Sequence, residues 1–277
     1  MKVPGFSDFG KSAKEVLYGG GKGGTYQYDQ KLKLSSKATD GMAFTLSSTV
    51  KGDKVSGEFK SSYSYERYSV DATVNNANKV TVKGNIADFL VPGLKCTGSF
   101  ALPATSPSKV GLQYTRPYLN TKVDVDATTS PKVTASLATG YAKMLYGADC
   151  TYDSAKGAFS SWSFGTVYTG PGYEATALYN DKGILKALHA QNLDDKTVLG
   201  VEIVRSLKDE SSQTFAFGLT RLLNSGVLIK GKAESSGVTS VLYEHQIEKG
   251  VKLALSGQFD AKNLDKGAKV GASLEIS

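Results

Sequence analysis

The sequence predicts an all-β protein, a transmembrane β-barrel of about nineteen strands with a short N-terminal amphipathic helix in its lumen. Alternating apolar and polar residues recur at near-regular intervals almost to the C-terminus, and no helical pattern separates the alternating stretches after residue 24. Successive side chains of a β-strand point to opposite faces, so each stretch has one apolar and one polar face. Such a sheet needs an apolar partner for its whole apolar face, which is either lipid or a second sheet.

Length and composition are compatible with both partners. The chain has 277 residues, of which 40% are hydrophobic and 21% charged, and polar lumen residues give a membrane barrel a similarly modest average. No run of the sequence approaches the roughly 18 apolar residues of a membrane-spanning helix. The N-terminal residues contain no apolar signal segment, so secretion is not expected. A barrel without such a signal is expected in an organelle that imports β-barrels after synthesis.

The first 24 residues differ from the rest of the chain. Apolar residues recur at helical spacing in residues 7–18, with Ser7 as the expected N-cap, which predicts a short amphipathic helix. A glycine-rich segment follows, and we expect it to act as a flexible hinge; its glycines are Gly19, Gly20, Gly21, Gly23 and Gly24. The predicted organisation is therefore a helix and hinge in residues 1–24 and a β-barrel in residues 25–277.

Strands and tight turns account for the remainder of the chain. Alternation is clear in the ranges 26–34, 119–126, 251–260 and 269–276, and turn residues stand at 51–54, 75–78, 153–157 and 180–183. At roughly ten residues per tilted strand and about three per turn, the chain accommodates about nineteen strands. Alternation is poor in residues 182–195 and 236–247, so strand boundaries there are undefined. With an odd count, the first and last strands should pair in parallel.

The choice between lipid and a second sheet rests on the apolar faces. These are lightly populated by large aliphatic residues, and most turns are short, which favours a lipid-facing barrel over a soluble β-sandwich. Tyrosines near the expected strand ends suit an interfacial aromatic girdle; they are Tyr26, Tyr114, Tyr118 and Tyr173. The sandwich, as a soluble binding module, is the alternative from a different functional class.

The charge pattern indicates a basic wall. The formal net charge is +7, and the lysines are spread along the alternating strands without a dense basic run interleaved with aromatic residues, so nucleic acid is not an expected partner. The candidate pore-lining residues for anion selectivity are Lys11, Lys14, Lys31, Lys33, Lys95 and Lys122. With a positive potential, the pore should favour anionic metabolites.

Signals for catalysis, cofactors or metals are weak. The glycines of residues 19–24 match a dinucleotide fingerprint in spacing, but they follow a helix and precede a strand, which is the reverse of the required context. His189 and His245 are far apart in the sequence, and Cys96 and Cys150 are interpreted as ordinary strand residues. No enzyme activity, metal site or cofactor is expected.

Specific segments resemble the mitochondrial voltage-dependent anion channel family. Val3-Pro4 and residues 8–17 resemble its N-terminal segment, residues 250–256 and 260–263 its penultimate hairpin, and Gly93-Leu94-Lys95 its Gly-Leu-Lys triplet. Nineteen strands is the known count for that family, so the strand count expected from this sequence agrees with the family and is not an independent result. The resemblance implies nucleotide interaction at Gly93, Leu94 and Lys95.

The resemblance further implies a voltage-gated, weakly anion-selective pore of the mitochondrial outer membrane. Membrane lipid is an implied partner, adenine nucleotides and small anions are the implied solutes, and a homo-oligomer is compatible with the family. Val74 stands where animal members carry a lipid-facing glutamate, which suggests a plant-like or algal member. The alternative within the same fold class is the sister barrel that forms a protein-import pore.

Overall fold

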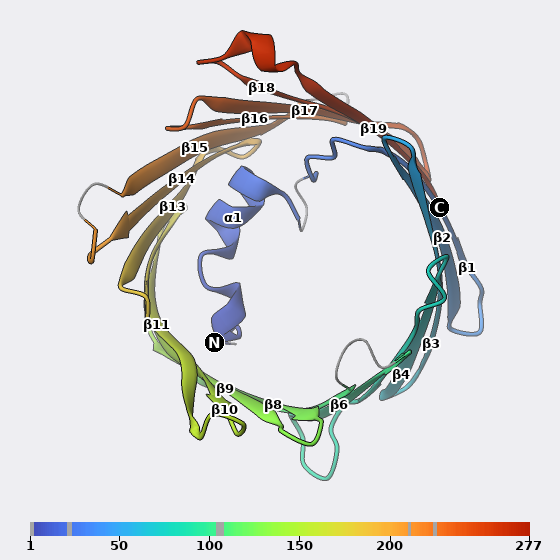
Figure 1. Ribbon diagram of the computed structural model, residues 1–277, viewed down its shortest axis with the longest axis vertical. Coiled ribbons are helices and arrows are strands. Elements are labelled where there is room, and N and C mark those ends of the chain that lie inside the picture. Colours follow the sequence, from blue (N-terminus) through green and yellow to red (C-terminus); the bar gives the residue numbers. More distant parts are fainter. Residues whose placement is uncertain (1–2, 21–23, 104–107, 210–211, 224–225) are drawn as a thin grey trace. The chain divides into compact units, whose positions relative to one another are not determined.

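A computed structural model describes residues 3–20, 24–103, 108–209, 212–223 and 226–277. Within these residues the chain forms nineteen β-strands in one sheet, together with one short α-helix and two 3₁₀ turns (Figure 1). Strand β1 pairs both with β2 and with β19. A sheet whose first and last strands pair has no free edge, which is the topology of a β-barrel. The predicted fold class and strand count are confirmed.

The elements follow one another with short connections. The helical elements are η1 (Phe6–Asp8), α1 (Lys11–Tyr18) and η2 (Leu264–Lys266). The first ten strands are β1 (Gln30–Lys37), β2 (Met42–Lys51), β3 (Lys54–Tyr65), β4 (Tyr68–Asn75), β5 (Val80–Ile86), β6 (Leu94–Leu102), β7 (Ser108–Arg116), β8 (Leu119–Ala127), β9 (Lys132–Tyr141) and β10 (Met144–Asp153). The others are β11 (Ala158–Gly170), β12 (Tyr173–Asn180), β13 (Ile184–Asp194), β14 (Thr197–Ser206), β15 (Gln213–Leu222), β16 (Val227–Glu234), β17 (Val238–Glu248), β18 (Val251–Asp260) and β19 (Lys269–Ile276).

The chain divides into two compact units. The first consists of residues 1–8, 34–48 and 56–165, and the second of residues 9–33, 49–55 and 166–277. In the first unit, β3 to β10 are joined as consecutive antiparallel pairs. In the second, β12 to β19 are joined in the same way. Among the described residues, no helix is long and apolar enough to cross a membrane.

Each unit has one polar and one apolar sheet face, as the alternation predicts. In the second unit, α1 lies against β13, β14, β15 and β16 (Figure 1), and we call the face it contacts the polar face. On the opposite face, Phe217 remains 50% exposed and Ile203 41% exposed. In the first unit, the polar face is the one on which Asn120 donates a hydrogen bond to the Val3 carbonyl, at 3.2 Å. Large apolar side chains with high exposure cover the other face, as a lipid-facing surface requires.

The N-terminal helix differs from its prediction. A 3₁₀ turn occupies residues 6–8, and α1 begins only at Lys11, after Gly10 in a left-handed conformation with φ of 69°. The predicted N-cap at Ser7 is therefore wrong, and α1 has no side-chain cap. A left-handed residue cannot continue a right-handed helix, so Gly10 separates the two turns.

One strand prediction needs correction, and two ranges that the sequence left undefined form strands. The first strand begins at Gln30, so residues 26–29 of the predicted strand lie outside it. The poorly alternating ranges do form strands, β13 and β17, and each contains a register shift, between Asn192 and Asp194 and between Gln246 and Glu248. Both shifts lie at the strand ends, so they do not account for the poor alternation of the whole ranges. Apolar residues on the polar face account for it: Leu188 and Ala190 of β13 are buried with Ala13 of α1, and Leu242 of β17 is buried near Gly24.

The contacts between β1 and β19 run in parallel. Gly271 of β19 lies against the backbone of residues 27–29, which directly precede β1, and further along the chain Lys33 of β1 forms an ion pair with Glu275 of β19 at 3.3 Å. Both positions increase together along the pair, which is the direction predicted from an odd number of strands.

Candidate functional site: the docked helix and the polar face

Helix α1 docks where two strands carry paired glycines. Ala13, Val16 and Leu17 are its buried residues. Val16 lies over Gly200 of β14, where an added Cβ would be 2.8 Å from the Val16 Cβ atom. Gly218 of β15 pairs with Gly200, and an added Cβ there would be 3.2 Å from Leu17 Cδ2. The two glycines thus form a flat position on which the apolar side of α1 rests.

A buried lysine holds both ends of the glycine segment. The Lys230 side chain is 0% exposed, and its Nζ donates hydrogen bonds to the Glu15 carbonyl at 2.5 Å and to the Gly24 carbonyl at 2.9 Å. Its ammonium also lies 5.4 Å from the centre of the Tyr26 ring. Because an ammonium without partners is costly to bury, this arrangement resists any movement that separates Lys230 from the two carbonyls.

A second lysine of the same strand contacts the same segment. Lys232 Nζ lies 4.7 Å from the ring centre of Tyr18 and 5.9 Å from that of Tyr26, and it is paired with Glu234 at 2.7 Å. The cations of β16 therefore lie beside Tyr18, the last residue of α1, and Tyr26, the second residue after the glycine segment.

Tyr18 connects the helix to an acidic residue of β14. Its hydroxyl donates to Glu202 Oε1 at 2.5 Å, and Lys186 lies 3.2 Å from Glu202 Oε2. Burial, followed by the hydrogen bond to Glu202 and nearby negative charge, raises the pKa of Tyr18 well above its usual range. Burial likewise raises the pKa of Tyr26. Both phenols thus stay protonated at physiological pH, and Tyr26, which lies beside these lysines, is not part of an aromatic girdle.

The hinge glycines have different surroundings. Gly19 has φ of 92° and donates its N–H to the Glu15 carbonyl at 3.2 Å, and Gly20 has φ of 113°. A side chain at Gly24 would meet Leu242 and the Glu244 carboxylate. Gly21 and Gly23 lie outside the described residues. The positive φ values of Gly19 and Gly20 are accessible to glycine and disfavoured for other residues, so the segment leaves the helix by a sharp turn.

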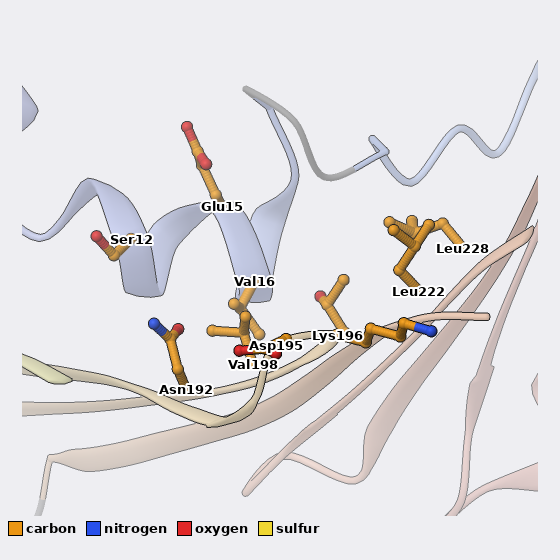
Figure 2. A pocket seen from close by; sticks show the side chains of 10 residues that line it. Ser12, Glu15, Val16, Asn192, Asp195, Lys196, Val198, Leu222 and Leu228 are labelled. Carbon is orange, nitrogen blue, oxygen red and sulfur yellow. The ribbon is translucent and has the colours of Figure 1, made fainter. Parts of the chain in front are cut away.

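A cavity of about 390 Å³ lies between one side of α1 and the ends of β13 to β16. Val16 points from α1 toward the strands, above Val198, while the Glu15 side chain projects away from them (Figure 2). Asn192, Asp195 and Lys196 contribute polar groups at the turn between β13 and β14. The helix thus covers its strands incompletely on this side.

The predicted pore-lining lysines share the polar face of their strands, and several are paired. Lys33 is paired with Glu275 at 3.3 Å, and with it Lys31 points to the same side of β1. Lys122 is paired with Asp124 at 2.5 Å. On α1, the Lys14 ammonium donates to the Phe9 carbonyl at 2.7 Å, and Lys11 is exposed. Neighbouring carboxylates thus offset part of the positive charge.

The residues of the Gly93-Leu94-Lys95 triplet do not converge on one binding site. Gly93 precedes β6 with φ of 87° and donates its N–H to Asp88 Oδ1 at 2.6 Å. Leu94 and Lys95 point to opposite faces, and Lys95 lies beside Gln113 on the polar face. Only Lys95 can therefore reach a solute on that face.

The other singled-out residues lie apart from the docked helix. Cys96 and Cys150 are free and half-buried. His189 lies 5.9 Å from the Tyr173 ring and His245 lies 6.2 Å from the Tyr243 ring, measured between ring centres. Val74 is 42% exposed on the apolar face of β4.

Sequence reasoning missed the residues that hold α1 in place, namely Lys230, Lys232, Glu202, Gly200 and Gly218. The glycines carried a usable signal, because a glycine inside a strand often marks close approach of another backbone. The lysines carried none, because an alternating lysine has the same pattern whether it faces water or a helix.

Comparisons with known proteins agree across the whole chain. A family model described as eukaryotic porin matches residues 2–271. The mitochondrial outer membrane porin of Triticum aestivum is 30% identical over 279 residues, covering 100% of this chain and 99% of the relative. Mitochondrial outer membrane protein porin 5 of Oryza sativa subsp. japonica is 31% identical over 280 residues, covering 100% and 99%. The outer plastidial membrane protein porin of Pisum sativum is 28% identical over 281 residues, covering 100% and 99%.

Solved structures show the same fold at low sequence identity. A mutant porin of Rh. blastica superimposes with a TM-score of 0.52 at 7% identity, covering 90% of this chain and 96% of that chain.

Proposed function

Because the chain belongs to the eukaryotic porin family, we propose that it forms a voltage-gated, weakly anion-selective pore of the mitochondrial outer membrane. Small anions and adenine nucleotides are its proposed solutes. The apolar face contacts lipid in this proposal, and the polar face lines an aqueous channel. The names of the plant relatives support the mitochondrial location, although one relative is plastidial.

The observation that carries this proposal is the placement of lysines on the face that contacts α1. Wide aqueous pores discriminate by potential more than by fit, so a basic wall should favour anions. The ion pairs on the same face, such as Lys186 with Glu202 and Lys252 with Glu244, limit this preference. Weak selectivity follows from that partial compensation.

The docked helix supports a gating role. It lies on the polar face, carries Lys11 and Lys14, and is attached through a glycine segment held by Lys230. Moving this helix would change both the width and the charge of the channel. Lys95 is the member of the Gly-Leu-Lys triplet that we propose to contact nucleotides.

Neither alternative function fits this chain as well as a metabolite pore. The soluble β-sandwich is wrong, because the strands form one sheet in which β1 pairs with β19. The protein-import barrel shares the fold class, but the relatives described above are named as porins, which favours the metabolite pore.

A planar-bilayer recording across a salt gradient tests the proposal. We expect stepwise conductance and a reversal potential whose sign indicates higher permeability to anions than to cations. Conductance should fall at high voltage of either sign, and adenine nucleotides should block it partially. Purified protein that inserts but conducts cations preferentially would contradict the proposed selectivity. Absence of any conductance would contradict the pore itself.

A further inference from the structure

An apolar loop projects from one edge of the first unit. Residues 87–93 connect β5 to β6 and include three consecutive apolar residues, Phe89, Leu90 and Val91. Leu90 is 84% exposed, Val91 43% and Phe89 38%. Nothing in the described chain covers the Leu90 side chain, although burial of a leucine side chain is favourable.

The loop holds this side chain outward in a defined conformation. Leu90 has φ of 63° and Asp88 has φ of 51°, values in the left-handed region. Phe89 N–H donates to the Leu94 carbonyl at 2.8 Å, Leu94 N–H to the Val91 carbonyl at 3.1 Å, and Gly93 N–H to Asp88 Oδ1 at 2.6 Å. A left-handed leucine is unfavourable and persists only where its surroundings impose it, so the outward position of Leu90 is built into the loop.

Two arginines lie on either side of the loop. The carbonyl of Arg67, in the turn between β3 and β4, accepts a hydrogen bond from Ala87 N–H at 2.8 Å. On the other side, Thr115 N–H, adjacent to Arg116, donates to the Gly93 carbonyl at 2.9 Å. Each guanidinium is stacked near a tyrosine: Arg67 Cζ is 5.4 Å from the Tyr68 ring centre and Arg116 Cζ is 5.5 Å from that of Tyr114.

This combination of groups matches the chemistry of a bilayer interface. Apolar side chains bury themselves at the boundary between headgroups and acyl chains, tyrosines prefer the same depth, and arginines pair with phosphate oxygens. The opposite edge of the same unit has a different composition. Its turns read Asn-Asn-Ala-Asn at 75–78 and Asp-Ser-Ala-Lys-Gly at 153–157.

We propose that Phe89, Leu90 and Val91 insert into the headgroup–acyl boundary of one leaflet, and that Arg67 and Arg116 bind lipid phosphate groups beside them. The inference rests on the proposed function, because it requires the chain to span a bilayer. It adds that the two edges of the first unit contact the membrane differently. The loop edge is anchored in lipid, and the opposite edge is exposed to water.

Depth-dependent fluorescence quenching tests the insertion. In a Trp162→Phe background, Leu90→Trp supplies the probe and Asn76→Trp, in a turn of the opposite edge, supplies the matched control. Both are reconstituted in phospholipid vesicles without other proteins, with lipids brominated near the carbonyl end or near the methyl end of the chain. We expect the probe at position 90 to lose most of its fluorescence to the shallow bromines and the control at 76 to respond mainly to aqueous iodide.

Quenching of the probe at position 90 by iodide, with no quenching by brominated lipid, would overturn the inference. A protein partner would then be the remaining candidate to cover the apolar loop. Bilayer conductance of the same preparations separates this failure from failure of the proposed function. Conducting protein without lipid quenching contradicts only the loop insertion, and protein without conductance contradicts the pore.

Lipid retention tests the arginines. Native mass spectrometry of detergent-extracted protein should show fewer bound phospholipids for Arg67→Gln with Arg116→Gln than for the unmodified protein. The matched control is Lys79→Gln with Lys156→Gln, which removes two cations from the opposite edge of the same unit and should leave retention unchanged. Equal retention in both double variants would contradict the phosphate contacts.

Discussion

Lys230 Nζ lies 2.9 Å from the carbonyl oxygen of Gly24, and the same ammonium lies 2.5 Å from that of Glu15. One side chain of β16 therefore joins the residues on the two sides of the glycine segment. As long as both hydrogen bonds remain, the chain between α1 and Gly24 cannot extend. The glycine segment can therefore act as a flexible hinge only when Lys230 has released at least one of the two carbonyls.

Replacing Lys230 should release the helix. Lys230→Met keeps much of the side-chain length and removes both charged hydrogen bonds, each worth roughly 1.5–3 kcal/mol net. We expect faster hydrogen exchange in residues 11–18 and noisier open states in bilayer recordings. Lys249→Met, in the turn between β17 and β18, is the control. Unchanged exchange in the helix would show that Lys230 does not hold it.

The paired glycines should be required for docking. Gly200→Ala places a methyl group against Val16, and overpacking of this kind costs roughly 1–3 kcal/mol. Gly231→Ala is the matched control, because a Cβ at Gly231 meets nothing within 4 Å. Helix exchange should rise in the first variant only, and adding Val16→Ala should reverse it. If both alanine variants behave alike, the glycine contact is unimportant.

Proline in the hinge should alter gating without unfolding the strands. The variant combines Gly20→Pro, Gly21→Pro and Gly23→Pro. Proline fixes φ near −65°, whereas Gly20 has φ of 113°, so the exit from the helix must change. Voltage-dependent closure is the measurement, with circular dichroism as the check on folding. An unaltered voltage response would contradict the hinge hypothesis.

Crosslinking should show the parallel seam of the sheet. In a background with Cys96→Ser and Cys150→Ser, cysteines are scanned across positions 28–32 and 270–276. The crosslinked position in the second range should increase as the position in the first range increases, in keeping with the contacts at Gly271 and Glu275. The opposite trend would mean an antiparallel pair and an even strand count.

Charge reversal tests the origin of selectivity. The quadruple variant carries glutamate at Lys11, Lys14, Lys31 and Lys95, and we expect it to favour cations. Single changes should shift the reversal potential only modestly, because each charge is screened over about 8 Å at physiological salt. Lys156→Glu and Lys182→Glu, in turns, should do much less. A quadruple variant that inserts normally and still prefers anions contradicts the basic-wall account.

The strands were predictable because alternation is a local property. A lipid-facing sheet repeats one apolar and one polar side chain along every strand, so the pattern fixes which residues share a face without knowledge of their neighbours. It is weak in β13 and β17, where Leu188, Ala190 and Leu242 are apolar residues of the polar face buried near α1 and the glycine segment. Lys33 and Lys122 were placed on the polar face by this argument, and the structure has them there.

The docking of α1 was less predictable because it depends on contacts between distant residues. Ser7 has the composition of a helix cap, but the left-handed Gly10 starts the helix later. Tyr26 looked like a girdle residue, yet Lys230 and Lys232 lie beside its ring. Lys230 differs from the other lysines of alternating strands because it donates to two backbone carbonyls of distant residues. The sequence around Lys230 contains no sign of that contact.

The parallel seam has a consequence for the order of assembly. Lys33 and Glu275 are 242 residues apart in the sequence. Strand β1 therefore gains its β19 neighbour last, when the whole chain between them is present and the intervening hairpins can form. Hairpins between consecutive strands close short loops, whereas this pairing closes nearly the entire chain, and long-range contacts of this kind form late and slowly. Until then both terminal strands expose unpaired backbone groups, which lipid cannot satisfy. A chain truncated before β19 should therefore remain outside the bilayer even though most of its hairpins are intact.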